Sequence, residues 1–340
     1  MSTSVLQKTL TEAEAPSTVV SVVAAIAEAC RAISADLRTD TVVAAQSSNS
    51  FGDEVLSVDV MAERHIATKL CDCSAVATIV SEERPVLTPT PNAGSGLYTV
   101  SYDPLDGSSI IATNFSVGSI FAVWPGRSPI GLQVRDMVAS VVSLYGPRTV
   151  LFVAFSPTAN TTSTTSVGTV LRFYLHGNTW TPLRDSVPRQ ISKKATIFAP
   201  GNLRASLELP WYRDIVLAYM NEKATLRYTG GMVPDVCQIV VKGDGVYMTP
   251  ATPNHKMKLR LIFEAAPMTF LVVCAGGRAT TGHTDMMEVR VDEVEQRTAI
   301  ALGSSWDVKR YERMCRYHSN SSNSITNKDR NNSDNHGSKL

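Results

Sequence analysis

The sequence lacks a strong charge of either sign. Its 340 residues contain 32 Lys and Arg against 31 Asp and Glu, which leaves a formal net charge of +1. Domains that bind nucleic acid or an anionic membrane usually carry a marked basic excess, so this balance disfavours both as partners. The hydrophobic content of 44% predicts a globular chain with one large or two coupled domains.

Export and membrane signals are also scarce. The N-terminus has a single Lys, two Glu and no long apolar core, which fits neither a secretory signal nor an Arg-rich transit peptide. No uninterrupted run of about 18 apolar residues occurs, so we expect no membrane span. The six cysteines form no C-x-x-C pair, which disfavours a zinc or thioredoxin-type site.

Apolar periodicity predicts alternating helices and strands, an α/β fold class. We expect a buried helix over Ser17–Leu37 and a second over Val55–Leu70, with Glu63 on its polar positions. The first group of expected strands comprises Val76–Val80, Tyr98–Tyr102, Ser119–Trp124, Val138–Tyr145, Thr149–Phe155 and Thr169–His176. In the second half, helices are expected at Leu209–Asn221 and Val233–Val241, and strands at Ala195–Ala199, Val246–Thr249, Lys258–Phe263 and Val289–Val291.

Composition also predicts the domain organisation. Prolines and charges interrupt the apolar pattern over Thr181–Lys194, which marks the expected boundary. We therefore expect a flexible N-terminus over 1–16, one subdomain over 17–185 and a second over 186–317. Twelve of the last 23 residues are Ser or Asn, so 318–340 should be a disordered tail.

The chain ends in Ser338, Lys339 and Leu340. A C-terminal S-K-L is an address that a peroxisomal import receptor reads, and a flexible tail presents it well. The sequence therefore predicts a peroxisome-type organelle, the glycosome in a trypanosome-like protist, with or without a cytosolic fraction.

The most informative segment is DPLDGSS, which follows the expected strand Tyr98–Tyr102. Asp103 and Asp106 lie three residues apart, and a proline stiffens the turn between them. Oxygen-only ligation of this kind suits Mg²⁺ or Mn²⁺. The backbone N–H groups of the following Gly and Ser residues are suited to hold a phosphate against the metal.

Further acidic residues flank expected elements. Asp53 and Asp59 lie near the start of a helix, Glu82 and Glu83 follow a strand, and Glu264 follows the run KLRLIF. Alone, each is equally a helix-start acid or a solvated loop residue. Together they predict a cleft whose carboxylates would repel one another unless cations neutralise them. This arrangement is what metal-assisted phosphoester hydrolysis needs.

These segments carry a resemblance. DPLDGSS, the preceding SEE, GD with LSVD, and RLIFEAAPM resemble the signature set of the fructose-1,6-bisphosphatase family, within the lithium-sensitive Mg²⁺-dependent phosphatase superfamily, over about residues 47–306. SSIIATNFSVGSIFAVWPG, SLYGPRT, FAPGNLRA and RYTGGMVPDVCQIV resemble its branch that hydrolyses the 1-phosphate of sedoheptulose 1,7-bisphosphate.

The resemblance implies a layered α/β sugar-phosphatase fold with two or three Mg²⁺ per site, for which Mn²⁺ can substitute. It implies metal ligation by Asp53, Glu82, Asp103, Asp106, Glu264 and the Leu105 carbonyl. Glu83 with Asp59 would activate or position water. The scissile phosphate would be held by Gly107, Ser108, Ser109, Lys258 and Arg260, and the sugar and distal phosphate by Asn202, Arg227 and Tyr228. A homo-oligomer, dimer or tetramer, is implied, with Arg227 reaching a neighbouring subunit.

Several alternatives stay open at this level. Lys258 and Arg260 also fit the exposed face of a strand, Tyr228 fits a core position, and Asn202 fits a turn. The substrate alternatives are fructose 1,6-bisphosphate alone or both bisphosphates, and an inositol-monophosphatase-like activity fits the extended match less well. From another class, a catalytically silent sugar-phosphate sensor would not need Asp59 and Glu83 beyond the metal ligands.

Overall fold

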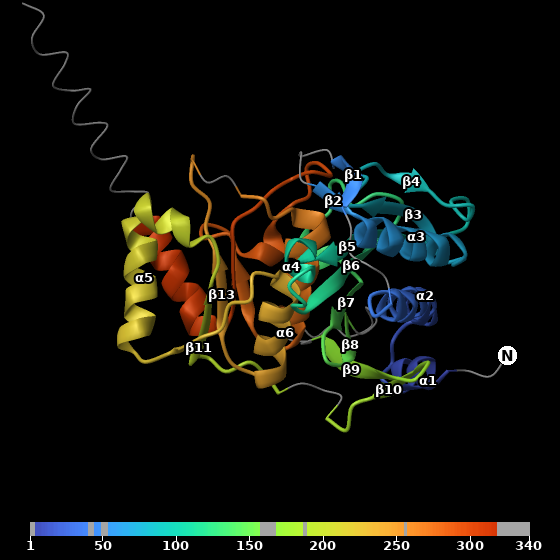
Figure 1. The fold of residues 1–340 in the computed structure, drawn as a ribbon, viewed down its shortest axis with the longest axis horizontal. Coiled ribbons are helices and arrows are strands. Elements are labelled where there is room, and N and C mark those ends of the chain that lie inside the picture. Colours follow the sequence, from blue (N-terminus) through green and yellow to red (C-terminus); the bar gives the residue numbers. More distant parts are fainter. Residues whose placement is uncertain are drawn as a thin grey trace, which may run out of the picture.

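Layers of helices and sheets alternate through the molecule in the computed structural model (Figure 1). The structure describes residues 4–39, 44–48, 54–156, 168–185, 189–254 and 257–317. Helices α1–α3 cover one face of an eight-stranded sheet, and α6 and α7 lie between that sheet and a five-stranded one. Helix α5 and the helical residues 305–317 cover the outer face of the second sheet. The predicted α/β layered fold is confirmed.

The larger sheet has the strand order β10-β9-β8-β7-β6-β5-β3-β4. Its neighbours are antiparallel except for the parallel pair β3 and β5. Both faces of the sheet are buried, because Ile120 and Ala122 of β6 face α6 and α7 while Phe121 and Val123 face α1–α3. The strands are β3 (Val76–Ser81), β4 (Thr88–Pro89), β5 (Tyr98–Asp106), β6 (Val117–Pro125), β7 (Ala139–Tyr145), β8 (Thr149–Phe155), β9 (Thr169–His176) and β10 (Thr179–Pro182).

Three N-terminal helices cover one face of this sheet: α1 (Val5–Glu12), α2 (Ser17–Asp36) and α3 (Ser57–Cys71). The prediction of a flexible N-terminus over 1–16 is wrong for its described residues. Ser4 and Gln7 form a capping box at the start of α1, and Leu6 and Leu10, one turn apart, are buried in the core.

Helix α2 is long and apolar enough to cross a membrane, the single such helix among the described residues. Its most apolar window has a mean hydropathy of 1.6 and is 56% buried within the protein, where α2 contacts α3, β7 and β8. The core helix of a globular protein meets the same criteria of length and composition, and α2 occupies such a position.

The second sheet has the order β12-β11-β13-β15-β14. Its strands are β11 (Ile197–Pro200), β12 (Thr225–Leu226), β13 (Val246–Thr249), β14 (Arg278–Thr280) and β15 (Ile300–Gly303), and a further two-stranded pair comprises β1 (Ala44–Ser48) and β2 (Glu54–Leu56). The remaining helices are α4 (Ser108–Ile111), α5 (Pro210–Asn221), α6 (Met232–Lys242) and α7 (Ala266–Cys274), with short 3-10 turns η1 (Val134–Asp136), η2 (Leu203–Leu207) and η4 (Met286–Glu288).

Two predicted strands of the second half are wrong. Lys258–Phe263 is not a strand: Arg260 makes an isolated bridge to Arg297, and a π-helical turn, η3 (Leu261–Ala265), leads directly into α7. Val289–Val291 contributes only an isolated bridge between Gln133 and Arg290. All three apolar residues of η3 that precede Glu264 are buried, so strand-like alternation was not a reliable guide there.

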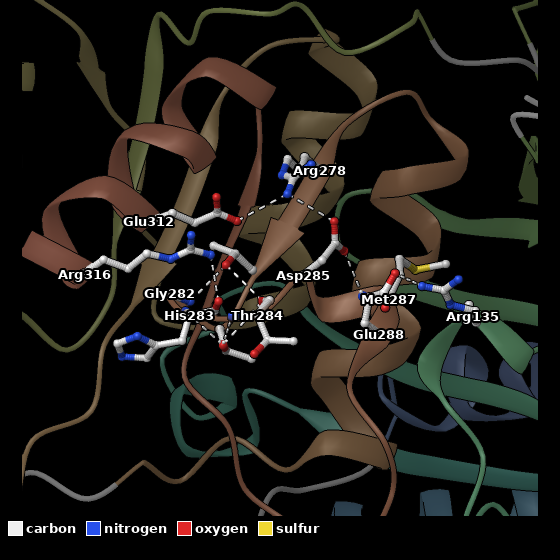
Figure 2. Close-up of polar contacts among 12 residues, drawn as sticks. Arg135, Arg278, Gly282, His283, Thr284, Asp285, Met287, Glu288, Glu312 and Arg316 are labelled. Carbon is white, nitrogen blue, oxygen red and sulfur yellow. Dashed lines mark hydrogen bonds and ion pairs between the residues drawn. The ribbon is translucent and has the colours of Figure 1, made fainter. Parts of the chain in front are cut away.

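Polar contacts at η1 and η4 join the two halves of the molecule (Figure 2). Arg135 of η1 forms an ion pair with Glu288 of η4. On the same loop, Asp285 lies 3.2 Å from Arg278 of β14, which also lies 3.4 Å from Glu312 in the helical residues 305–317. Residues 285–288 are therefore tied both to β14 of their own sheet and to η1, which lies between β6 and β7 of the larger one.

Candidate active site

The site forms where the parallel strands β3 and β5 end. Ser81 pairs with Tyr102 in register, so the residues that follow, Glu82 and Asp103, begin at the same edge of the sheet. The backbone N–H of Glu82 donates to the Tyr102 carbonyl at 2.9 Å and continues the ladder by one step. The parallel pairing therefore brings together Glu82 and Asp103, which are 21 residues apart in the sequence.

A β-bulge aims both aspartates of DPLDGSS at one side of the sheet. Asp103 pairs with Ile120 and Asp106 with Gly118, so three steps along β5 match two steps along β6. In a regular strand, residues three apart point to opposite faces, and the extra residue of a bulge corrects this. Both carboxylates consequently point toward α6 and the second sheet.

Three carboxylates converge at this place. Ligand oxygens of Glu82, Asp103 and Glu264 all lie within 4.8 Å of one another. Glu264 comes from the π-helical turn η3, so the second half of the chain completes the cluster; such turns are frequent at functional sites. A cluster of carboxylate oxygens fits a hard divalent cation better than any soft metal.

Burial makes the charged form of this cluster costly. Burial, and then the charges of Asp106, Glu264 and Asp59, raise the pKa of Asp103 well above its usual range. Burial raises the pKa of Asp106 to about 6 despite two backbone donors, and that of Glu264 to about 7. Carboxylates that repel one another in a buried place are stabilised when a cation neutralises them. The donor set therefore fits a divalent metal.

Without a cation, the cluster makes folding stability depend on pH. Because the folded-state pKa values of Asp106 and Glu264 lie above the usual 3.8 and 4.5, the folded protein binds these protons more tightly than the unfolded chain. This contribution is full below about pH 4 and is lost as pH rises through about 7. We expect Tm in EDTA to fall between about pH 5 and pH 8, and saturating Mg²⁺ to flatten that fall. A Tm in EDTA that rises across this interval would contradict the assignment.

Asp106 has a second role that its position in the sequence did not suggest. Its carboxylate accepts hydrogen bonds from the backbone N–H groups of Met232, at 3.3 Å, and Val233, at 2.7 Å, and so caps α6. Close packing allows this contact, since a Cβ at Gly118 would lie only 2.4 Å from Val233. The cap links the candidate metal cluster to the segment before α6.

The two halves of the chain match the two domains of one protein family. Residues 1–175 match the model of the N-terminal domain of fructose-1-6-bisphosphatase, and residues 191–316 match that of its C-terminal domain. The chain belongs to the fructose-1,6-bisphosphatase family. It is therefore a member of a family of sugar bisphosphatases, which are phosphoric monoester hydrolases.

The relatives within the family are named after two different substrates. The chloroplastic sedoheptulose-1,7-bisphosphatase of Triticum aestivum is 38% identical over 307 residues, which are 90% of this chain and 75% of that protein. The class 1 fructose-1,6-bisphosphatase of Geobacter sulfurreducens is 34% identical over 89% of this chain and 93% of its own length.

Solved structures give the same two names. A Toxoplasma gondii protein, assigned provisionally as a sedoheptulose-1,7 bisphosphatase, superposes with a TM-score of 0.84 at 35% identity, over 92% of this chain and 98% of its own. The holo form of Leishmania major fructose-1,6-bisphosphatase superposes with a TM-score of 0.80 at 25% identity, over 92% and 99%.

The two residues predicted to act on water lie beside the cluster. Asp59, in the first turn of α3, is 4% exposed, and its charge contributes to the raised pKa of Asp103. Glu83 follows Glu82 directly and is half-buried, and its backbone N–H donates to the Ser81 hydroxyl at 3.2 Å. Both therefore lie next to the candidate ligands, while their action on water stays a prediction.

Arg260 lies within the acidic cluster. The side chain is 3% exposed, forms an ion pair with Glu82 and donates to the Glu82 carbonyl at 3.1 Å. Its backbone N–H donates to Glu264 at 2.7 Å. The interpretation of Arg260 as the exposed face of a strand is thus wrong, although its contact with the scissile phosphate stays a prediction. Lys258 is exposed.

The predicted phosphate-binding residues begin at the end of β5. Gly107 has a φ of +83°, a left-handed conformation that favours glycine, and starts the short helix α4. Ser108 is half-buried and Ser109 is exposed on the first turn of α4, directly beyond Asp106. Leu105 precedes them, and its backbone N–H donates to Asp103 at 2.9 Å.

The residues predicted for the sugar and distal phosphate divide into two groups. Tyr228, on the loop after β12, is 45% exposed, and burial, and then the charges of Asp235 and Asp106, raise its pKa. Arg227 is exposed next to it. The side-chain amide of Asn202, by contrast, donates to the Pro250 carbonyl at 2.7 Å and holds two turns together. Asp53 and the terminal Ser338, Lys339 and Leu340 lie outside the described residues.

Sequence reasoning did not place Glu63 beside the site. It predicted only that Glu63 is one of the polar residues of a helix. Glu63 is half-buried and lies one helical turn after Asp59. Its carboxylate accepts hydrogen bonds from the hydroxyls of Ser81 and Tyr102. The four-residue spacing from Asp59 was a usable signal, because it predicts that the two side chains share one face of the helix.

Proposed function

We propose that the protein hydrolyses the 1-phosphate of sedoheptulose 1,7-bisphosphate, with Mg²⁺ as the metal, to give sedoheptulose 7-phosphate and phosphate. The observation that carries the proposal is the cluster of Glu82, Asp103 and Glu264 within a chain of this family. The substrate follows from the identity of 38% with a plant sedoheptulose-1,7-bisphosphatase.

The side chains support this reaction. A divalent metal held by the carboxylates would supply Lewis-acid stabilisation of the phosphoryl oxygens and of the leaving alkoxide. Glu83 with Asp59 would orient the attacking water and accept its proton. Gly107, Ser108 and Ser109 would hold the scissile phosphate at the edge of the cluster, while Tyr228 and Arg227 would contact the sugar and its distal phosphate.

Fructose 1,6-bisphosphate is the second candidate substrate. The bacterial fructose-1,6-bisphosphatase that covers 89% of this chain supports it, as does the fold shared with the Leishmania enzyme. A non-catalytic sugar-phosphate sensor is the alternative from a different class of protein.

Phosphate release from the purified protein separates these candidates. We expect release from both bisphosphates to need added Mg²⁺ or Mn²⁺, to stop in EDTA, and to show a higher kcat/KM for sedoheptulose 1,7-bisphosphate. A higher kcat/KM for fructose 1,6-bisphosphate would make that sugar the preferred substrate. Metal-dependent binding of either sugar without any phosphate release would identify a sensor.

We also propose a homo-oligomer, dimer or tetramer, in which Arg227 reaches a neighbouring subunit. Exposed apolar side chains support this. Leu226 directly precedes Arg227 and is 58% exposed, and Leu207 on η2 is 84% exposed. Sedimentation of the purified protein at micromolar concentration measures the state directly, and a monomer would contradict the proposal.

The C-terminal tripeptide supports a further proposal, import into a peroxisome-type organelle through its receptor. Because receptors read S-K-L as a free C-terminus, deleting Ser338–Leu340 should move the protein to the cytosol and leave kcat and Tm unchanged. The measurement is imaging of the intact and truncated chains, each fused to an N-terminal fluorophore. Identical distributions of the two proteins would refute the targeting role.

A further inference from the structure

Glu63 is positioned to hold the two strand ends of the active site together. It lies on α3, one turn after Asp59, so the two side chains share a face of the helix. One carboxylate oxygen accepts the Ser81 hydroxyl at 2.6 Å, and the other accepts the Tyr102 hydroxyl at 3.0 Å. The single side chain thus bridges α3 to both β3 and β5.

The two residues that Glu63 contacts are direct partners in the sheet. Ser81 pairs with Tyr102 in the parallel register of β3 and β5. Each immediately precedes a carboxylate of the metal cluster, Glu82 after Ser81 and Asp103 after Tyr102. A displacement of either residue would therefore be passed on to a ligand through one peptide bond.

The contact with Ser81 also reaches Glu83. A hydroxyl has one proton to donate and lone pairs that accept. Since the Ser81 proton points to Glu63, its oxygen is left to accept the backbone N–H of Glu83 at 3.2 Å. The carboxylate of Glu63 therefore fixes the direction of a hydrogen bond that shapes the turn carrying Glu82 and Glu83.

Burial of the Glu63 carboxylate carries a desolvation cost. Burial raises its pKa, although the hydrogen bonds from Ser81 and Tyr102 and the charge of Arg84 lower it in part. A neutral amide would avoid this desolvation cost but would offer one acceptor oxygen in place of two, and an apolar side chain would offer none.

We propose that Glu63 is a positioning residue that sets Asp59, on its own helix, relative to Glu82, Glu83 and Asp103 at the strand ends. The inference rests on the proposed function, because it assigns Glu63 to the same metal-dependent site. Groups that hold metal ligands in place affect metal affinity and activity without contacting the metal themselves.

The test is Glu63→Gln, which preserves size and removes one acceptor and the charge. Its amide would have to present N–H groups toward either Ser81 or Tyr102. We expect kcat to fall and Mn²⁺ binding to weaken by about 10–100-fold each, KM to change by less than about 3-fold, and Tm to stay within about 3 °C, a shift on the order of 1 kcal/mol or less. Mn²⁺ binding is measured by EPR titration of the metal alone, without substrate.

Further variants show through which contact Glu63 acts. If Glu63 acts through Ser81, then Glu63→Gln and Ser81→Ala combined should cost little more than either change alone. Glu28→Gln is the matched control, because Glu28 is exposed on α2 and forms an ion pair with Arg31 at 3.0 Å. It should leave kcat and Mn²⁺ binding unchanged.

Wild-type kcat and Mn²⁺ affinity in Glu63→Gln would overturn the inference, and fully additive effects in the double variant would overturn the route through Ser81. Failure of the proposed function is distinguishable from both. If the wild-type protein released no phosphate from either bisphosphate, the function would fail, while the Mn²⁺ titrations would still decide whether Glu63 positions the carboxylates.

Discussion

Replacement of Asp103 by Asn should lower kcat by at least about 10³-fold and, in the absence of metal, should raise Tm. A catalytic metal supplies several kcal/mol of transition-state stabilisation, and each 1.4 kcal/mol corresponds to about tenfold in rate. Asn keeps the oxygen that accepts the Leu105 N–H, so the bulged strand should persist. It removes a buried charge that Asp106, Glu264 and Asp59 oppose, and this relief stabilises the metal-free fold.

The two halves of this expectation are measured separately, kcat at saturating Mg²⁺ and Tm in EDTA. Asp292→Asn is a suitable control, because the Asp292 side chain is 70% exposed, pairs at 3.6 Å with Arg290 and lies on the surface. It should change neither quantity. A variant at Asp103 that kept more than a tenth of the wild-type kcat, or that melted earlier than wild type in EDTA, would remove Asp103 from the metal cluster.

Replacement of Glu83 by Gln should lower kcat by about 10²–10⁴-fold with little change in KM. A positioned general base contributes about this much, and its effect appears mainly in the transition state. Glu83 lies next to a ligand, yet the described cluster of converging oxygens consists of Glu82, Asp103 and Glu264. We therefore expect Mn²⁺ affinity to be retained in this variant.

Glu82→Gln provides the contrast, since the two residues are adjacent and chemically identical. It should weaken Mn²⁺ binding, and added metal should recover part of its activity. If Glu83→Gln showed the same metal-dependent recovery, or only a raised KM, then Glu83 would belong to metal or substrate binding, and the general base would have to be sought at Asp59.

Much of the fold was predictable because most elements repeat one local signal. The runs Val76–Val80, Tyr98–Tyr102, Thr149–Phe155 and Thr169–His176 are rich in Val, Phe and Tyr, are bounded by turn residues, and lie in β3, β5, β8 and β9. The helix predicted at Ser17–Leu37 is α2. For α1 the signal was present but overlooked, since Ser4 and Gln7 have capping-box spacing before Leu6 and Leu10.

The site was predictable only in its acidic residues. Glu82, Asp103 and Glu264 do converge. Glu82 and Asp103 meet because the parallel strands β3 and β5 end at one sheet edge, whereas Glu264 joins them from the π-helical turn η3. The capping of α6 by Asp106 and the bridge formed by Glu63 depend on strand register and on a bulge, which no local pattern encodes. Likewise, KLRLIF alternates as a strand does, yet its last three residues, 261–263, belong to the π-helical turn η3, where all three are buried.

The cluster draws on both halves of the chain. Glu82 and Asp103 belong to the part that matches the N-terminal domain of the family, and Glu264 to the part that matches the C-terminal domain. Contacts such as the ion pair between Arg135 and Glu288 also join these parts (Figure 2). A metal ion bound by all three carboxylates would act as a removable cross-link between them. Because such a ligand stabilises only the docked arrangement, the free concentration of divalent cation would set how firmly the halves resist separation by proteolysis or force.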